Sequence, residues 1–145
     1  EILTLFSTKI NQGVKIIRNY ETIKNCIGDK NKLSQVWINL LNNALHAMNY
    51  KGTLEIKTEK IGNWIVISII DSGIGIKKEI QDRIFEPFFT TKMQGEGMGL
   101  GLDICKKIID SMNGIIEVES IPGKTRFSVW LQSVTAQEAE RIWEI

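Results

Sequence analysis

The side chains best suited to chemistry lie in one predicted helix, between Gln35 and Met48. At about 100° per residue, apolar side chains fill one side of this helix, while Asn39, Asn43 and His46 stand nearly in line on the other. Asparagine is a poor helix former, and a solvated helix face normally carries Lys, Glu and Arg instead. Neutral amide oxygens in a row suit a hard cation, or a phosphate group that carries one. An exposed face that is merely rich in asparagine is the competing interpretation of this helix alone.

Two glycine-rich segments follow this helix in the chain. The first, Asp71-Ser-Gly-Ile-Gly75, comes directly after an apolar run. A carboxylate at a strand end, beside backbone freed by glycines, can accept a hydrogen bond from a planar donor such as an exocyclic amine; an ordinary turn is the alternative. The second, Gly97-Met-Gly-Leu-Gly101, precedes a predicted helix. Glycines there let phosphate oxygens reach the N–H groups at the helix start, and a flexible hinge is the alternative.

Three common nucleotide-binding signatures do not fit the chain. A Rossmann fingerprint, read from either possible start, has leucine at its last glycine position. A Walker loop that ends at Gly123-Lys-Thr has Val118 where its first glycine belongs. The His-Arg-Asp and Asp-Phe-Gly motifs of eukaryotic-type protein kinases do not occur in the sequence.

Length, composition and charge bound the function further. With 145 residues, 43% of them hydrophobic and 24% charged, the chain is expected to form one globular domain over residues 1–145. A net charge of +1 argues against nucleic-acid binding, and no apolar run approaches the length of a membrane span, so no direct membrane contact is expected. Cys26 and Cys105 are too few for a metal knuckle or a disulfide framework, and are expected to be reduced thiols of a cytoplasmic protein. The chain opens on Glu1 without a signal peptide, which suggests a piece of a longer protein.

Hydrophobic periodicity predicts the elements that position these residues. The asparagine-bearing helix should start near Lys32 and stop before Lys51, after a turn over residues 25–31. Strands are predicted at 13–20, 53–59, 64–70, 115–120 and 125–131, with 64–70 central and covered on both faces. Further helices are predicted at 77–84, from the second glycine-rich segment to Met112, and in a C-terminal tail (132–145) that starts with a capping box at Thr135. The predicted fold class is an α+β two-layer sandwich, with a mixed, mostly antiparallel sheet and helices on one face.

Taken together, these motifs resemble those of the ATP-binding domain of bacterial sensor histidine kinases, of the Bergerat or GHKL type. The resemblance covers residues 31–131, in the order and spacing of the family. It rests on an N box (Asn39-Leu-Leu-Asn-Asn43-Ala44), a first glycine box (Asp71-Ser-Gly-Ile-Gly75-Ile76), an F box (Phe85-Glu-Pro-Phe88-Phe-Thr-Thr-Lys92) and a second glycine box (Gly97-Met-Gly-Leu-Gly101-Leu102). It implies the Bergerat fold, with ATP and Mg²⁺ as cofactors.

The resemblance also implies roles for individual residues. Asn43 would ligate the Mg²⁺ that bridges the ATP phosphates, Asn39 would support that site, and His46 and Lys92 would lie near the phosphates; these four are the candidate catalytic residues. A surface histidine and an exposed lid lysine are the alternatives for the last two. Asp71 would bind the adenine amino group. The other candidate nucleotide-binding residues would line the base, the lid and the helix that follows it: Ala47, Gly73, Gly75, Ile76, Phe88, Thr91, Gly97, Met98, Gly99, Leu100, Gly101, Leu102 and Thr125.

Two features depart from the family pattern. The last box usually reads Gly-x-Gly-Thr-x-Phe, whereas the chain has Gly123-Lys-Thr125-Arg-Phe127, which is one glycine short. The substrate histidine is also missing, because the one histidine, His46, lies inside the N box and the hairpin that carries the phospho-acceptor is absent. The chain is therefore expected to be a catalytic fragment, or a subunit that acts on a histidine elsewhere, and a monomer because the family dimerises through that hairpin.

One position helps to choose the reaction. ATPases that resemble this family, such as DNA gyrase, MutL and Hsp90-type chaperones, place a glutamate four residues before the Mg²⁺-binding asparagine, where it activates water. Here that position is Asn39, whose amide cannot take a proton. This favours transfer of the γ-phosphate to the histidine of a dimerisation and phosphotransfer domain, with a lid at about 90–98 closing over ATP and a response regulator downstream. A GHKL-type ATPase with a displaced base and a non-catalytic ATP-sensing module are the alternatives.

Overall fold

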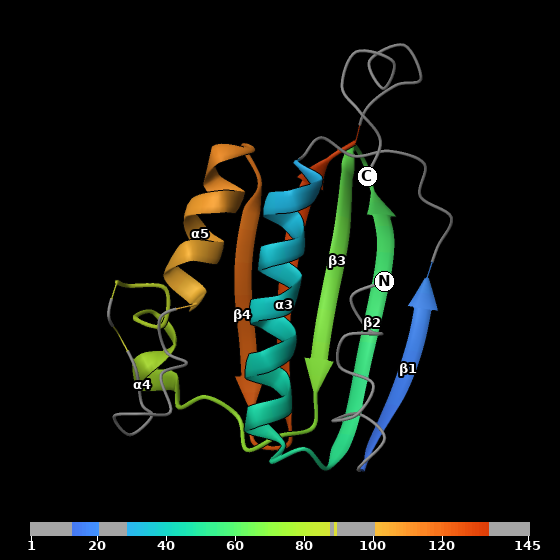
Figure 1. Ribbon diagram of the computed structural model, residues 1–145, viewed down its shortest axis with the longest axis vertical. Coiled ribbons are helices and arrows are strands. Elements are labelled where there is room, and N and C mark those ends of the chain that lie inside the picture. Colours follow the sequence, from blue (N-terminus) through green and yellow to red (C-terminus); the bar gives the residue numbers. More distant parts are fainter. Residues whose placement is uncertain (1–12, 21–28, 88, 90–100, 134–145) are drawn as a thin grey trace.

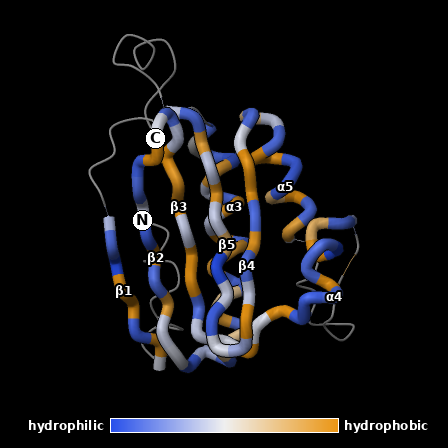
Figure 2. The backbone as a smooth tube through the Cα atoms, turned by 180° about the vertical axis from the view of Figure 1, so that it is seen from behind, coloured by the Kyte–Doolittle hydropathy of each residue, from blue (hydrophilic) through white to orange (hydrophobic). Residues whose placement is uncertain are grey.

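Five strands form one sheet, and helices pack on one of its faces. The computed structural model describes residues 13–20, 29–87, 89 and 101–133, and the strand order is β1-β2-β3-β5-β4. The elements are β1 (Val14–Tyr20), α3 (Lys30–Ala47), β2 (Gly52–Ile61), β3 (Trp64–Asp71), α4 (Lys78–Gln81), α5 (Gly101–Ser111), β4 (Ile115–Ile121) and β5 (Lys124–Gln132). Figure 1 shows α3 and α5 in front of the sheet, and Figure 2 shows the sheet from behind, where no described helix covers it.

The sheet is mixed and mostly antiparallel. β1 pairs with β2 in parallel, whereas β2 with β3, β3 with β5 and β4 with β5 are antiparallel pairs. The predicted α+β two-layer sandwich is therefore confirmed. β3 is buried on both faces, as its apolar sequence predicts: Ile69 joins the core, while Val66 and Ser68, which alternation places on the opposite face, are 1% and 0% exposed. On that face the Arg126 guanidinium donates to Ser68 Oγ (3.1 Å) and to Glu59 (3.3 Å).

Two predicted boundaries were wrong for identifiable reasons. Helix α3 begins at Lys30, inside the predicted turn, because the Asp29 carboxylate caps it by accepting hydrogen bonds from the N–H groups of residues 31 and 32. Helix α4 spans four residues rather than 77–84; the chain continues in turns that still bury Ile84. The predicted helix in the tail from Thr135 lies outside the described residues.

The hydrophobic core fills the space between the helices and the sheet. Helices α3 and α5 supply much of it, through Leu33, Val36, Leu40, Leu41, Ala44, Leu45, Leu102, Cys105 and Ile109. Burying one leucine or isoleucine side chain stabilises the fold by about 1.5–3 kcal/mol, so this layer fixes where both helices sit on the sheet. None of the described helices combines the length and apolarity that a membrane span needs.

Several of the segments that carry the sequence motifs meet at one end of the sheet. Helix α3 and strand β3 end there and the β4–β5 hairpin turns there, toward the lower end of Figure 1, while α5 begins beside the middle of α3, where Gly101 contacts Asn39. This end of the molecule is therefore the place to look for a functional site.

Candidate functional site

A buried carboxylate lies at the end of the central strand. Asp71 is 3% exposed, and its Oδ1 accepts a hydrogen bond of 2.8 Å from the Gly73 N–H. Burial raises the pKa of Asp71 from 3.8 to about 6, although the Gly73 hydrogen bond opposes this rise. Thr125, which is 2% exposed, is its partner on the neighbouring strand β5. Near neutral pH the charged Asp71 is a strong hydrogen-bond acceptor in a poorly hydrated site.

The loop over residues 71–76 is wedged between α3 and the last hairpin. A Cβ on Gly73 would lie 2.6 Å from the carbonyl oxygen of Ala47, at the end of α3. That same carbonyl accepts a hydrogen bond of 3.2 Å from the Ile74 N–H. On the other side, Gly75 has φ +86°, and a Cβ there would lie 2.8 Å from the carbonyl of Ile121. Both glycines are thus required by close approach to the protein's own backbone.

The asparagine face of α3 is turned toward the start of α5. The Asn39 side chain donates a hydrogen bond of 3.3 Å to the carbonyl of Gly101. Burial raises the pKa of the Cys105 thiol to about 11, and hydrogen bonding with Asn39 has a smaller, opposing effect. Asn43 is half-buried one turn further along. His46 is exposed, and its ring lies 5.5 Å from the ring of Tyr50.

Sequence comparison places the chain in a known family. The sequence model described as "Histidine kinase-, DNA gyrase B-, and HSP90-like ATPase" matches residues 28–135. The chain belongs to this family. The chain is 39% identical to the sensor histidine kinase ZraS of Salmonella typhimurium over 120 residues, which cover 81% of this chain and 25% of ZraS. It is also 39% identical to sporulation kinase A of Bacillus subtilis over 132 residues, 89% of this chain and 22% of that kinase. The chain therefore spans about a quarter of the length of these curated relatives.

Solved structures give the same result for the fold of this ATPase-family domain. The nucleotide-free catalytic domain of the histidine kinase ThkA matches with a TM-score of 0.81 and 32% identity, covering 91% of this chain and 88% of that one. The structure of ThkA in complex with the response regulator protein TrrA matches with a TM-score of 0.75 and 29% identity, covering 92% of this chain and 38% of that one. Membership of an ATPase family makes ATP the ligand class of the chain.

The structure brings part of the predicted site together. Asn39 contacts Gly101, Asp71 lies opposite Thr125 in the strand register, and Gly73 lies against Ala47, while Leu102 is buried in the core. Seven of the predicted residues lie outside the described part of the chain: Phe88, Thr91, Lys92, Gly97, Met98, Gly99 and Leu100.

The aromatic residues before the second glycine box have a structural role. The ring of Phe85 packs edge-on against Phe127, with centroids 6.3 Å apart, and Phe85 thus joins the edge of the core. Phe89 is half-buried against the core and carries the Arg83 guanidinium 5.0 Å over its ring.

Sequence reasoning missed two residues at this end of the ATPase-family fold. Ser120 Oγ accepts a hydrogen bond of 2.8 Å from the Ile76 N–H and lies 2.6 Å from Thr125 Oγ1. The Gln81 amide donates to the carbonyls of Ile76 (2.8 Å) and Ser120 (3.2 Å). The available signal was the alternation Ile116, Val118, Ser120, which continues the inward face of β4 with a polar residue.

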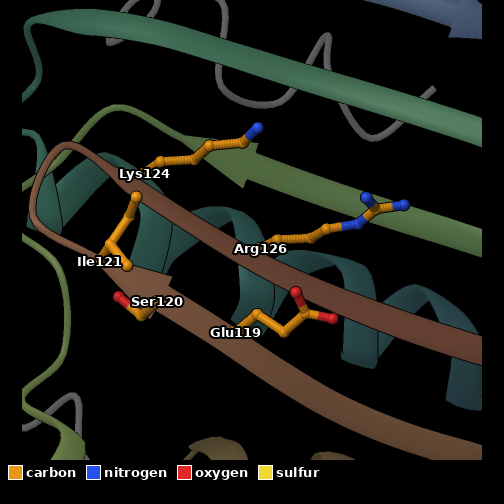
Figure 3. A pocket seen from close by; sticks show the side chains of 5 residues that line it. All are labelled: Glu119, Ser120, Ile121, Lys124 and Arg126. Carbon is orange, nitrogen blue, oxygen red and sulfur yellow. The ribbon is translucent and has the colours of Figure 1, made fainter.

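A hollow of about 220 Å³ also lies on the hairpin. Figure 3 shows its lining, which consists of Glu119, Ser120, Ile121, Lys124 and Arg126. None of the candidate nucleotide-binding residues lines this hollow. Its Arg126 is already paired with Glu59 of β2 at 3.3 Å. The hollow therefore adjoins the loop over residues 71–76 through Ser120 and Ile121 without being lined by a candidate nucleotide-binding residue.

Proposed function

We propose that the chain is the ATP-binding catalytic domain of a two-component sensor histidine kinase. In this proposal it transfers the γ-phosphoryl group of ATP to a histidine on a separate dimerisation and phosphotransfer domain, from which a response regulator then receives it. The supporting similarity is to sensor kinases over 81–89% of this chain. The whole unit, residues 1–145, would act as one domain in the cytoplasm, where ATP is available.

The observation that carries the proposal is the side chain four residues before Asn43. An ATPase of this family would need a general base there, but Asn39 is an amide, and its nitrogen donates to the Gly101 carbonyl. An amide cannot remove a proton from water, so hydrolysis lacks its catalyst at this position. Transfer to a protein nucleophile needs no such base, because positioning and charge neutralisation dominate phosphoryl transfer.

The residues at the site can be assigned to parts of the nucleotide. In the proposal Asp71 accepts a hydrogen bond from the adenine amino group, beside Ala47, Gly73, Gly75, Ile76 and Thr125. Its burial favours this role, since a buried acceptor that lacks water gains most from a ligand donor. His46, Gly101 and Leu102 would border the phosphates, together with Phe88, Thr91, Lys92 and residues 97–100 of the F box and lid.

Mg²⁺ fits this assignment as an ion that is bound mainly by the nucleotide. Among the described residues, no three His, Cys, Asp or Glu side chains cluster in a way that could hold a metal ion by themselves. The Asn43 amide offers one oxygen ligand on the polar face of α3. Mg²⁺ commonly takes one or two protein ligands together with phosphate oxygens and water, and when bound it would neutralise phosphate charge.

The transfer step is balanced without a further reactant. A neutral imidazole nitrogen of the partner histidine attacks the γ-phosphorus, the bond from that phosphorus to the β–γ bridging oxygen breaks, ADP leaves with the electron pair, and the imidazolium ring formed releases the proton of its other nitrogen to solvent. This chain holds the adenine and the phosphates in line with that nitrogen. It offers no general base at Asn39 that could activate a competing water molecule.

A reconstituted transfer assay tests the proposal. The chain is mixed with Mg²⁺, radiolabelled ATP and a separately purified histidine-bearing hairpin from the same parent protein. We expect acid-labile, base-stable label on the hairpin, and none on a matched hairpin whose histidine is replaced by glutamine. Steady ATP hydrolysis without label would instead identify an ATPase with a displaced base. Tight ATP binding with neither reaction would identify an ATP-sensing module, and either result would overturn the proposal.

A further inference from the structure

We infer that Ser120 and Gln81 are positioning residues for ATP binding, because they fix the loop over residues 71–76 to the last hairpin. This inference rests on the proposed function, in which that loop receives the adenine ring. Neither residue belongs to a motif that the sequence singles out. Both act through the loop rather than by contact with the nucleotide.

The first observation is that both backbone polar atoms of Ile76 are bound by these two side chains. The Ile76 N–H donates to Ser120 Oγ at 2.8 Å, and the Ile76 carbonyl accepts from Gln81 Nε2 at 2.8 Å. Gln81 also donates to the Ser120 carbonyl at 3.2 Å, so α4, β4 and the loop meet at one point. These groups are partly buried, and a lost bond would leave backbone groups poorly satisfied.

The second observation is that the same hydroxyl connects the two ends of the loop. Ser120 Oγ lies 2.6 Å from Thr125 Oγ1, and Thr125 is the β5 partner of Asp71, where the loop begins. The N–H of Ile76, where the loop ends, donates to the same Ser120 Oγ. A displacement of Ile76 is therefore linked through two hydroxyl groups to the strand that carries the buried carboxylate.

The middle of the loop rests on the same hairpin. The Gly123 N–H donates to the Gly73 carbonyl at 3.0 Å, and the backbone at Gly75 lies close enough to Ile121 that a Cβ would clash. Figure 3 shows Ser120 close to the turn of this hairpin, next to Ile121. The hairpin thus acts as a frame for the loop, and Ser120 is the side chain by which the frame holds the loop's last residue.

Nucleotide binding and phosphotransfer by variants of the full 145-residue chain test this role. Ser120→Ala should weaken ATP and ADP by the same factor, about five- to tenfold, because it affects the loop that receives the base and not the phosphates. The KM for ATP should rise by that factor, while kcat at saturating ATP stays within about twofold. Ser120→Thr keeps the hydroxyl and should retain most of the affinity. Gln81→Met, which removes the amide donor at similar size, should weaken both nucleotides to a lesser extent.

Ser128→Ala is the matched control. Ser128 is a buried serine of the same hairpin, 7% exposed, whose hydroxyl lies 3.3 Å from Ser68 and makes no described contact with the loop. We expect unchanged affinity for both nucleotides. The inference would be overturned if Ser120→Ala and Ser128→Ala lost equal nucleotide affinity. It would also be overturned if Ser120→Ala lost affinity for ATP alone, or if its kcat fell at constant KM.

Hydrogen exchange in the nucleotide-free chain separates this inference from the proposed function. The Ile76 amide should exchange about tenfold faster in Ser120→Ala than in the wild type, with the core amides of β3 unchanged. If the wild type binds no adenine nucleotide, the proposed function fails whatever the exchange rates are. If the wild type binds ATP but Ile76 exchanges equally in both proteins, the positioning role alone is wrong.

Discussion

The side-chain amide of Asn39 lies 3.3 Å from the backbone carbonyl of Gly101, which joins the middle of α3 to the first residue of α5. The contact is so close that a Cβ on Gly101 would lie 3.1 Å from Asn39 Cγ. Sixty-two residues separate the two positions in the chain. The asparagine that replaces an ATPase glutamate is therefore engaged in fixing the start of the helix that follows the second glycine box.

A double-mutant cycle should reveal this contact as a coupling energy. Gly101→Ala introduces a methyl group against the Asn39 side chain, whereas in an Asn39→Ala background that space is free. Alanine also favours the helical conformation more than glycine does, and this gain opposes the clash in the free energy of unfolding of the single variant. We expect Gly101→Ala to be less favourable in the wild type than in Asn39→Ala by about 1 kcal/mol, measured by urea unfolding. Additivity within about 0.3 kcal/mol would contradict the contact.

Asp71 should destabilise the nucleotide-free fold as pH rises. Its pKa is about 6 in the folded state because burial disfavours the charge, and 3.8 is the ordinary value. Between about pH 4 and pH 6 the folded protein holds a proton that the unfolded chain has lost, so this group lowers the free energy of unfolding with rising pH. The loss amounts to about 3 kcal/mol and is complete above about pH 7.

Asp71→Asn isolates that effect, because other titrating groups cancel in the comparison. We expect the variant to be more stable than the wild type at about pH 7.5 by up to about 3 kcal/mol, and the difference to shrink toward pH 4. Urea unfolding of both proteins across that range measures it. The same variant should lose ATP binding, since the amide can no longer offer a charged acceptor to the adenine amine. A stability difference that does not change with pH would refute the assignment.

Much of the fold could be predicted because the spacing of hydrophobic residues carries most of the information on helices and strands. The alternation of Leu54, Ile56 and Thr58 marked β2, and the unbroken apolar run after Trp64 marked the central strand. The start of α3 was missed because Asp29 fits a turn as well as it fits a cap, and only the hydrogen bonds distinguish the two. The prediction extended α4 too far, to residue 84, because turns can bury Ile84 as well as a helix can.

The site was predictable only where a motif is local in the chain. Asp71 and Gly73 could be recognised as one motif because the carboxylate and the N–H that donates to it are only two residues apart. Ser120 gave no comparable signal, since its contacts with Ile76 and Thr125 depend on the register of the hairpin and on where the loop ends. A single serine at an inward strand position is otherwise unremarkable in sequence.

Gly73 should tolerate no larger side chain. A Cβ there would lie 2.6 Å from the Ala47 carbonyl, which is backbone and cannot move without shifting the end of α3. We expect Gly73→Ala to lower the free energy of unfolding by about 2–3 kcal/mol and to weaken ADP at least about tenfold. Thermal unfolding and calorimetry measure the two effects.

Gly62→Ala provides the comparison for Gly73. Gly62 has φ +58° in the β2–β3 turn, with open space around its missing side chain. Alanine there should cost about 1–2 kcal/mol of backbone strain and leave ADP affinity unchanged. If Gly73→Ala behaved like this control, the close approach of the loop to α3 would not matter for binding.

Asn43 should be required for the part of ATP binding that depends on Mg²⁺. Removing its amide oxygen takes away the protein ligand proposed for the ion, so Asn43→Ala should abolish the gain in ATP affinity that Mg²⁺ gives, while metal-free binding of adenosine stays unchanged. Asn42→Ala is the control, because the neighbouring asparagine is also half-buried on α3 but points about 100° away. Calorimetry with and without Mg²⁺ measures both. Unchanged Mg²⁺-dependent affinity in Asn43→Ala would remove Asn43 from the metal site, and an equal loss in Asn42→Ala would show a general effect on the helix rather than a lost ligand.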